Sequence, residues 1–156
     1  MISTQTDSHR ARRGETAPVA IIGAGTAGSV LALLLAQYGI RSVLVERGTQ
    51  ADPHPRGNVW SIRSMEVLRS IAPALADDFR EASAPPLKLR YITWCTSLAG
   101  VDLGRCVPLG DPAHTAALLA CSPCRPLHLS QNVADPILRA QVLAQPLIEF
   151  LPGHAL

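Results

Sequence analysis

The stretch that decides the fold is AIIGAGTAGSVLALLLAQYGIRSVLVE, residues 20–46. Its β-branched opening predicts a buried strand at 19–22, and the longer apolar run predicts a helix at 26–38 that Gly39 ends. A second apolar run predicts another strand at 42–45. Two buried strands joined by a helix form a βαβ unit, so the sequence indicates an α/β fold with parallel strands.

Three glycines connect the first strand to the helix at the spacing G-x-G-x-x-G, namely Gly23, Gly25 and Gly28. In that order they allow a tight turn with positive φ, close approach of a pyrophosphate to the backbone, and close packing of the helix on the strands. The helix begins with Thr26 and Ala27, and its first N–H groups together with its dipole attract phosphate. These five residues are therefore candidates for binding a dinucleotide.

An acid follows the second strand. Glu46 stands at its carboxyl end, about 20 residues past the glycines. There it can accept hydrogen bonds from the hydroxyls of an adenosine ribose, and its charge would repel a 2′-phosphate, which argues against NADP in this site. The glycine turn, helix and acid together predict a dinucleotide site. The alternative is a glycine-rich turn that binds nothing.

The apolar run at 19–36 can also be interpreted as an export signal or a membrane span, because Arg12 and Arg13 precede it. Three glycines at phosphate-loop spacing are unusual in a signal core, and no small-residue cleavage site follows. The run therefore indicates a buried helix of a cytoplasmic protein without a membrane partner. Because this helix is apolar on nearly all sides, we expect protein to cover most of its faces.

The 156 residues suit one domain, and a hydrophobic content of 47% with 17% charged residues describes a globular chain. The net charge is only +2, the basic residues are dispersed and aromatic residues are few, so nothing indicates a nucleic-acid surface. Cys121 and Cys124 have the spacing of a metal knuckle, but no second such pair exists and no histidine stands at a standard offset. We expect no metal site and ordinary reduced cysteines.

The rest of the chain divides into short predicted elements. Residues 1–17 are polar and predict a disordered leader. Further helices are expected at 61–71, at 74–82 (short and polar) and at 135–143, the last opening with Asp135-Pro136. Further strands are expected at 89–96, 101–105 and 147–151, the first two as a hairpin. Residues 47–59 and 106–127 carry prolines and small residues and are expected to be irregular.

Four segments, in this order, resemble the amino-terminal part of FAD-dependent aromatic hydroxylases, the single-component flavoprotein monooxygenases of the phenol and hydroxybenzoate hydroxylase type. They are the βαβ unit at 19–47, PHPRGNVWSIRSMEVLRSI at 53–71, the hairpin containing TSLAGVDLGR, and LSQNVADPILRAQ from Leu129. The resemblance implies a Rossmann-like FAD-binding domain over 18–156, in which 85–128 start a β-rich insertion on the substrate side.

The resemblance also implies three further contacts with FAD. Arg56 would lie over the phosphate side of the cofactor, Gln131 would hydrogen-bond its ribityl or phosphate portion, and Arg47 would lie across its adenine side. For each of them the alternative is a solvated polar side chain. Arg63 is a weaker candidate, and we expect it to pack or form a salt bridge near its own helix.

The chain departs from the family pattern at several points. Thr26 stands where proline is common, and Ala134-Asp135 replace a Leu-Glu pair. The family's later D-G and G-D motifs do not occur, and Gly110-Asp111 is expected to be an ordinary turn. We therefore expect an incomplete domain, an amino-terminal fragment or truncated product, with strand 19–22 at a sheet edge and little stability alone.

The function implied by the resemblance is hydroxylation of a small aromatic substrate by an FAD-dependent monooxygenase that takes electrons from NAD(P)H. No catalytic residue can be named from this chain, its oligomeric state is not indicated, and we expect it to be inactive in isolation. Two alternatives stay open. One is a non-catalytic or decayed nucleotide-binding protein. The other, less supported, is an NAD-dependent dehydrogenase domain, in which strands and helices should keep alternating after Glu46.

Overall fold

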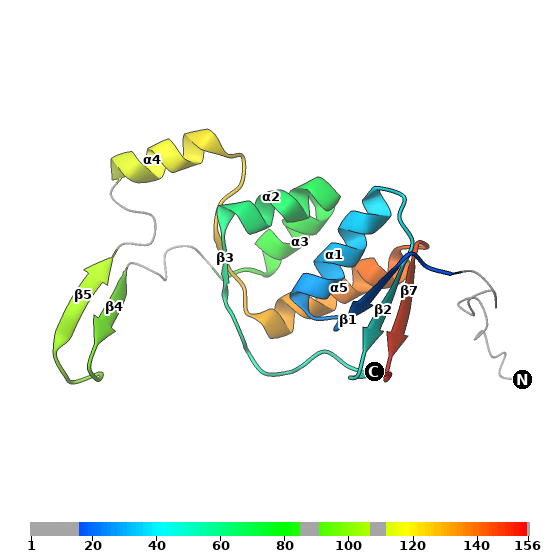
Figure 1. The fold of residues 1–156 in the computed structure, drawn as a ribbon. Helices are drawn as coiled ribbons and strands as arrows, with labels where there is room; N and C mark the ends of the chain where they lie inside the picture. The colour runs from blue at the N-terminus through cyan, green and yellow to red at the C-terminus, as the bar shows by residue number, and fades with distance from the viewer. Residues whose placement is uncertain (1–15, 85–90, 107–111, 156) are drawn as a thin grey trace, which may run out of the picture. The chain divides into compact units, whose positions relative to one another are not determined.

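The computed structural model describes residues 16–84, 91–106 and 112–155. They fall into two compact units (Figure 1). The first unit combines the chain up to residue 54 with the residues from 131 onward, and the second unit spans 55–130. The predicted leader, apart from its last two residues, and the predicted Gly110-Asp111 turn lie outside the described residues.

The first unit is built on a parallel sheet with the strand order β1 (Val19–Ile22), β2 (Ser42–Glu46), β7 (Ile148–Pro152). Helix α1 (Thr26–Gln37) connects β1 to β2, and α5 (Gln131–Ala144) leads into β7. The strand order runs in one direction, from β1 to β2 to β7. Right-handed connections between such strands place their helices on the same face of the sheet. Helices α1 and α5 pack side by side on that face (Figure 1). The predicted βαβ unit and the third strand are confirmed.

The core of the first unit lies between this sheet and its two helices. Its buried apolar residues are Ile21, Leu44, Val45 and Ile148 from the strands, Ala32, Leu33 and Ala36 from α1, and Ala134, Leu138 and Val142 from α5. Protein covers most faces of α1, as expected, because nine of its twelve residues are buried or half-buried and only Ala27, Leu31 and Gln37 are exposed. Strand β1 is an edge of the described sheet, as expected, and Ile22 is 57% exposed.

The start of α5 corrects another prediction. The helix begins at Gln131, not at Asp135-Pro136, so Pro136 lies inside it. Ala134 and Leu138 are fully buried, and this burial favours extending the helix toward its amino end. The proline sits near that end, and its missing N–H removes one backbone hydrogen bond. The Asp-Pro pair is typical of a helix start, but tertiary packing decided the boundary here.

The second unit has a small core of its own. Strand β3 (Val59–Trp60) pairs antiparallel with β6 (Leu127–His128), and helices α2 (Ile62–Ile71) and α3 (Pro73–Ala82) pack on each other. The Trp60 ring meets Phe79 edge-on at 4.8 Å between centroids, and Trp60 Nε1 donates to the carbonyl of Leu129 at 2.9 Å. Helix α3 was expected to be polar, but it buries Phe79, Leu75 and Ala76 and is therefore amphipathic.

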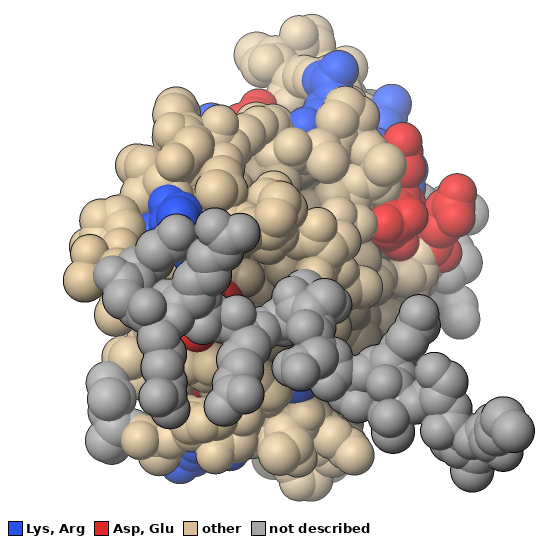
Figure 2. All heavy atoms as spheres, turned by 90° about the vertical axis from the view of Figure 1, so that its right-hand side faces the viewer, with Lys and Arg blue, Asp and Glu red and all other residues tan. Residues whose placement is uncertain are grey.

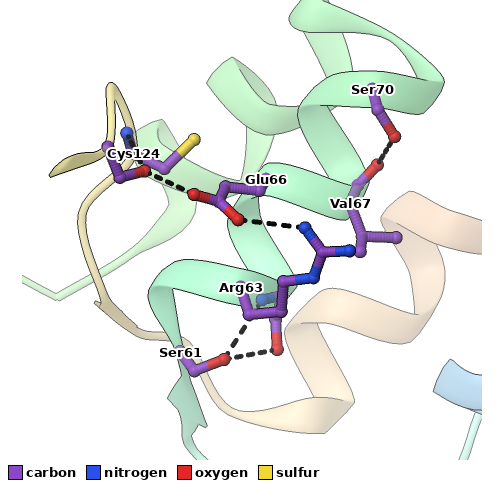
Figure 3. Close-up of polar contacts among 8 residues, drawn as sticks. Ser61, Arg63, Glu66, Val67, Ser70 and Cys124 are labelled. Carbon is purple, nitrogen blue, oxygen red and sulfur yellow. Dashed lines mark hydrogen bonds and ion pairs between the residues drawn. The ribbon is translucent and has the colours of Figure 1, made fainter.

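Polar contacts fasten α2 to the segment before β6 (Figure 3). The carboxylate of Glu66 accepts a hydrogen bond from the Ser122 hydroxyl at 2.8 Å and pairs with Arg63 at 3.2 Å, and both contacts lower the pKa of Glu66. The Ser122 oxygen also accepts the N–H of Cys124 at 3.1 Å. The expected salt bridge of Arg63 near its own helix is confirmed. Cys124 is buried and Cys121 is exposed, and both are free thiols.

The predicted hairpin is confirmed as β4 (Ile92–Cys95) and β5 (Asp102–Cys106), paired antiparallel. The prediction that 106–127 is irregular is wrong, because α4 (Pro112–Cys121) forms there. Its sequence PAHTAALLAC is rich in alanine and leucine, the strongest helix formers, and proline is well tolerated at the first helical position. The helix propensity of this segment outweighs its flanking prolines.

The charged residues form no extended stripe on the face drawn in Figure 2, where the described surface is mostly uncharged and groups of either sign are small. None of the helices in the described ranges has both the length and the apolar character needed to cross a membrane.

Candidate functional site

The glycine turn after β1 has the geometry that its three glycines predict. Gly23 adopts a φ of +99°, and its N–H donates to the carbonyl of Val45 at 2.7 Å, which ties the turn to β2. A Cβ added at Gly28 would overlap the carbonyl oxygen of Gly23 and lie 3.3 Å from a methyl group of Ile21. Only glycine therefore lets the helix approach the strand this closely at position 28.

Gly25 plays a different part, because it is the residue immediately before α1. Its φ of −70° is accessible to any amino acid, so its backbone does not demand glycine. What glycine provides here is space over the start of the helix. No side chain in the described structure caps this helix end. The amides of Thr26 and Ala27 lie in the first turn, at the positive end of the helix dipole, where such amides could donate to an anion.

A buried hydroxyl on α1 forms a hydrogen bond to the glycine turn. Ser29 is buried on α1, and its Oγ donates to the carbonyl of Ala24 at 3.1 Å, while its own N–H donates to the carbonyl of Gly25 at 3.0 Å. Both contacts hold the turn in the conformation that exposes the first amides of the helix. Sequence reasoning missed Ser29, although a single polar residue within an apolar helix was a signal for it.

Two backbone N–H groups hold the carboxylate of Glu46. Its Oε2 accepts from Ala24 N–H at 2.8 Å and its Oε1 from Gly48 N–H at 2.9 Å. These two bonds lower the pKa of Glu46, burial opposes them, and the charges of Arg47 and Arg139 add a further lowering. The side chain therefore stays ionised and in contact with the glycine turn. Each carboxylate oxygen keeps a second lone pair that could accept a ribose hydroxyl.

The Gln131 side chain lies beside the same turn. Its Nε2 atom is 4.0 Å from the position that a Cβ on Gly25 would take. The same nitrogen donates to Oδ2 of Asp135 at 3.0 Å, and Oδ1 of Asp135 accepts the Thr26 hydroxyl at 2.8 Å. The amino ends of α1 and α5 are thus joined next to the glycine turn. Sequence reasoning did not find Asp135 as part of this site.

The structure therefore brings most of the predicted residues together in the first unit. Those that surround the glycine turn are Gly23, Gly25, Thr26, Ala27, Gly28, Glu46 and Gln131. Arg47 directly follows Glu46 and is exposed. Arg56 is exposed and belongs to the second unit. The contacts expected of these two arginines with a cofactor stay predictions.

The family follows from comparison with known proteins. The family model described as an FAD binding domain matches residues 16–155, and the chain belongs to this family. The resemblance to flavoprotein aromatic hydroxylases is confirmed for this domain. The 2,4-dichlorophenol 6-monooxygenase of Cupriavidus pinatubonensis is 36% identical over 121 residues, which cover 77% of this chain and 20% of that protein. The chain spans about a fifth of the length of the curated relatives that it matches first.

Solved structures agree in fold. The flavin-dependent monooxygenase PieE, in complex with FAD and substrate, matches with a TM-score of 0.75 and 26% identity, over 88% of this chain and 24% of that one. Aklavinone-11 hydroxylase, in a ternary complex with FAD and aklavinone, matches with a TM-score of 0.71 and 28% identity, over 91% of this chain and 26% of that one. Both support the Rossmann-like arrangement of the first unit.

Proposed function

We propose that this chain is the FAD-binding amino-terminal part of an NAD(P)H-dependent flavoprotein monooxygenase that hydroxylates an aromatic substrate. The observation that carries the proposal is the glycine turn. Gly25 opens α1 without a side chain, Glu46 contacts the turn from β2, and the Gln131 amide lies beside it. This is the donor and acceptor set that an adenine dinucleotide needs, in a chain of the FAD binding domain family.

Each group has a part that follows from its chemistry. The amides of Thr26 and Ala27 would donate to the pyrophosphate, and the absent side chain of Gly25 leaves the phosphate room to approach them. The carboxylate of Glu46 would accept hydrogen bonds from the adenosine ribose. Gln131 would contribute a neutral amide on the phosphate or ribityl side, and the cations Arg47 and Arg56 would lie near the adenine and phosphate sides.

When bound, FAD supplies the redox chemistry between NAD(P)H and oxygen, and the protein binds, orients and shields it. The groups named above hold the cofactor and none of them is assigned to the aromatic substrate. We therefore expect the isolated chain to bind FAD without hydroxylating a phenol. The choice of an aromatic substrate rests on relatives such as the 2,4-dichlorophenol 6-monooxygenase and a phenol 2-monooxygenase of Pseudomonas.

Replacing Gly25 with valine tests the proposal directly. A Cβ at position 25 meets nothing nearer than the Gln131 amide at 4.0 Å and the backbone φ is ordinary, so Gly25→Val should fold. Its side chain would occupy the approach of the pyrophosphate, and we expect the Kd for FAD to rise at least about 100-fold, which corresponds to about 2.7 kcal/mol. Flavin fluorescence measures the Kd, and circular dichroism checks the fold.

Ala74→Val, on the exposed side of α3, is the matched control because it also introduces a valine side chain, but away from the turn. It should bind FAD like the parent chain. Unchanged FAD binding by Gly25→Val would mean that the glycine turn is not the site. A parent chain that binds NAD but not FAD would support the dehydrogenase alternative, and one that binds neither would overturn the proposed function.

A further inference from the structure

One carboxylate joins the two helices that meet at the glycine turn. Asp135 lies in the early part of α5 and accepts two hydrogen bonds, one on each oxygen. Its Oδ1 accepts from the hydroxyl of Thr26, the first residue of α1, at 2.8 Å. Its Oδ2 accepts from Nε2 of Gln131, on the preceding turn of its own helix, at 3.0 Å. The two donors come from different helices, so Asp135 fixes one relative to the other.

The bond to Gln131 restricts a side chain that would otherwise rotate. A glutamine side chain has three rotatable bonds and loses substantial entropy when it is held in one conformation. Here its Nε2 atom is held 4.0 Å from the Cβ position of Gly25. A primary amide has two N–H donors and one carbonyl acceptor. Asp135 takes one N–H, so the second N–H and the carbonyl oxygen stay available for a ligand at the turn.

We propose that Asp135 is a positioning residue of the cofactor site. It holds the Gln131 amide beside Gly25 and, through Thr26, fixes that amide relative to the first turn of α1. The second N–H of Gln131 and the amides of α1 can then contact the same phosphate group. Asp135 itself does not contact the cofactor. The inference rests on the proposed function, because it assigns the ligand at the turn as the pyrophosphate of FAD.

The negative charge of Asp135 would weaken the binding of a nearby phosphate, whereas its hydrogen bonds would strengthen it. A variant that removes only the charge therefore distinguishes the two effects. Asparagine at position 135 would remove the charge and keep the geometry, since its Oδ1 can accept from Gln131 and its amide can donate to the Thr26 hydroxyl. If Asp135 acts by positioning, Asp135→Asn should bind FAD at least as tightly as the parent chain. Asp135→Ala removes both acceptors, and we expect its Kd for FAD to rise about tenfold.

The decisive experiment is a double-mutant cycle on the Kd for FAD, measured with the full chain by flavin fluorescence. If Asp135 acts through Gln131, then Asp135→Ala should raise the Kd by less than about threefold when Gln131 is already alanine. A merely structural role would raise the Kd by the same factor in both backgrounds. Asp78→Ala, which removes an exposed acid from α3, is the matched control and should leave the Kd unchanged.

A spectroscopic reading covers the case in which Asp135→Ala fails to fold. The side-chain amide signal of Gln131, assigned by its loss in Gln131→Glu, should show a hydrogen-bonded shift in the parent chain and in Asp135→Asn. A solvent-like shift in the parent chain would overturn the proposal, as would equal factors in the cycle or weaker binding by Asp135→Asn. These outcomes would leave the proposed function standing. A folded parent chain that does not bind FAD would instead overturn the proposed function, so the two failures can be told apart.

Discussion

In strand β2 of the first unit, Ser42, Leu44 and Val45 are buried, whereas nearly every residue of the β4–β5 hairpin is exposed. The sequence predicts both regions as strands, β2 from an apolar run and the hairpin from an alternating pattern, and both form strands. They differ in what covers them. β2 has a hydrogen-bonded strand on each side and contacts α1, while the hairpin has two strands that pair with each other. The same local propensity thus produces a core strand in one place and a surface ribbon in the other.

The hairpin is held together mainly by contacts between its own neighbours. Arg105 stacks on the Tyr91 ring at 4.4 Å and pairs with Asp102 at 3.1 Å. Trp94 and Leu103 remain more than half exposed. Two-stranded hairpins have marginal stability by themselves, whereas buried parallel strands are stabilised by their whole surroundings. We infer that the folding energy of the described chain resides in the packed layers and not in strand pairing as such.

Truncating one leucine in each region should give the largest contrast. Leu44 is fully buried in the central strand, so Leu44→Ala should lower the free energy of unfolding by about 3 kcal/mol. Leu103, on β5, is 66% exposed, and Leu103→Ala should change it by less than about 0.5 kcal/mol. Urea unfolding followed by circular dichroism measures both. Similar losses would show that the hairpin carries buried contacts comparable with those of the sheet.

The two glycines around the start of α1 allow a finer test inside the packed region. Gly28→Ala places a methyl group on the carbonyl oxygen of Gly23, which is backbone and cannot rotate away, so we expect a loss of about 2 kcal/mol. Gly25→Ala has ordinary contacts and should change the free energy of unfolding by less than about 0.5 kcal/mol. If both variants lost the same stability, the close contact between α1 and the turn would be refuted.

Much of the first unit could be predicted from sequence because its signals are local. The spacing of Gly23, Gly25 and Gly28 between an apolar run and a helix leaves few other structures, and Glu46 at the end of the next strand completes the pattern. The boundary of α5 was mispredicted because tertiary contacts overruled the local signal there. α5 starts before its Asp-Pro pair because burial of Ala134 stabilises an earlier turn.

The contact between Thr26 and Asp135 shows a different limit. Each of the two residues departs from the family pattern. The structure joins them by a hydrogen bond between positions 109 residues apart. Proline, common at position 26, has no hydroxyl with which to make this bond. Nothing in the local sequence of either segment signals the contact, so only the folded chain shows that the two departures belong together.

The smallest expected change in the free energy of unfolding comes from replacing one acidic residue in each region, Glu46 in β2 and Asp102 in the hairpin. For Glu46 this change depends on pH. The bonds from Gly48 and Ala24 lower the pKa of Glu46 in the folded chain, so the unfolded chain takes up this proton more readily. The stability that Glu46 contributes is therefore complete at neutral pH and is lost as the pH falls through its folded pKa. Glu46→Gln should lower the free energy of unfolding by about 1 kcal/mol at pH 7. The loss should become smaller in acid, because protonation of Glu46 removes its stabilising contribution from the parent chain as well.

Asp102→Asn is the counterpart in the hairpin, where the carboxylate pairs with Arg105 in solvent. An exposed ion pair contributes little, so this variant should stay within about 0.5 kcal/mol of the parent chain. Urea titrations at pH 7 and near pH 3 measure both variants. The contrast holds if the difference between Glu46→Gln and the parent shrinks in acid. A constant difference would mean that the bonds to Ala24 and Gly48 do not favour the ionised carboxylate over the protonated one.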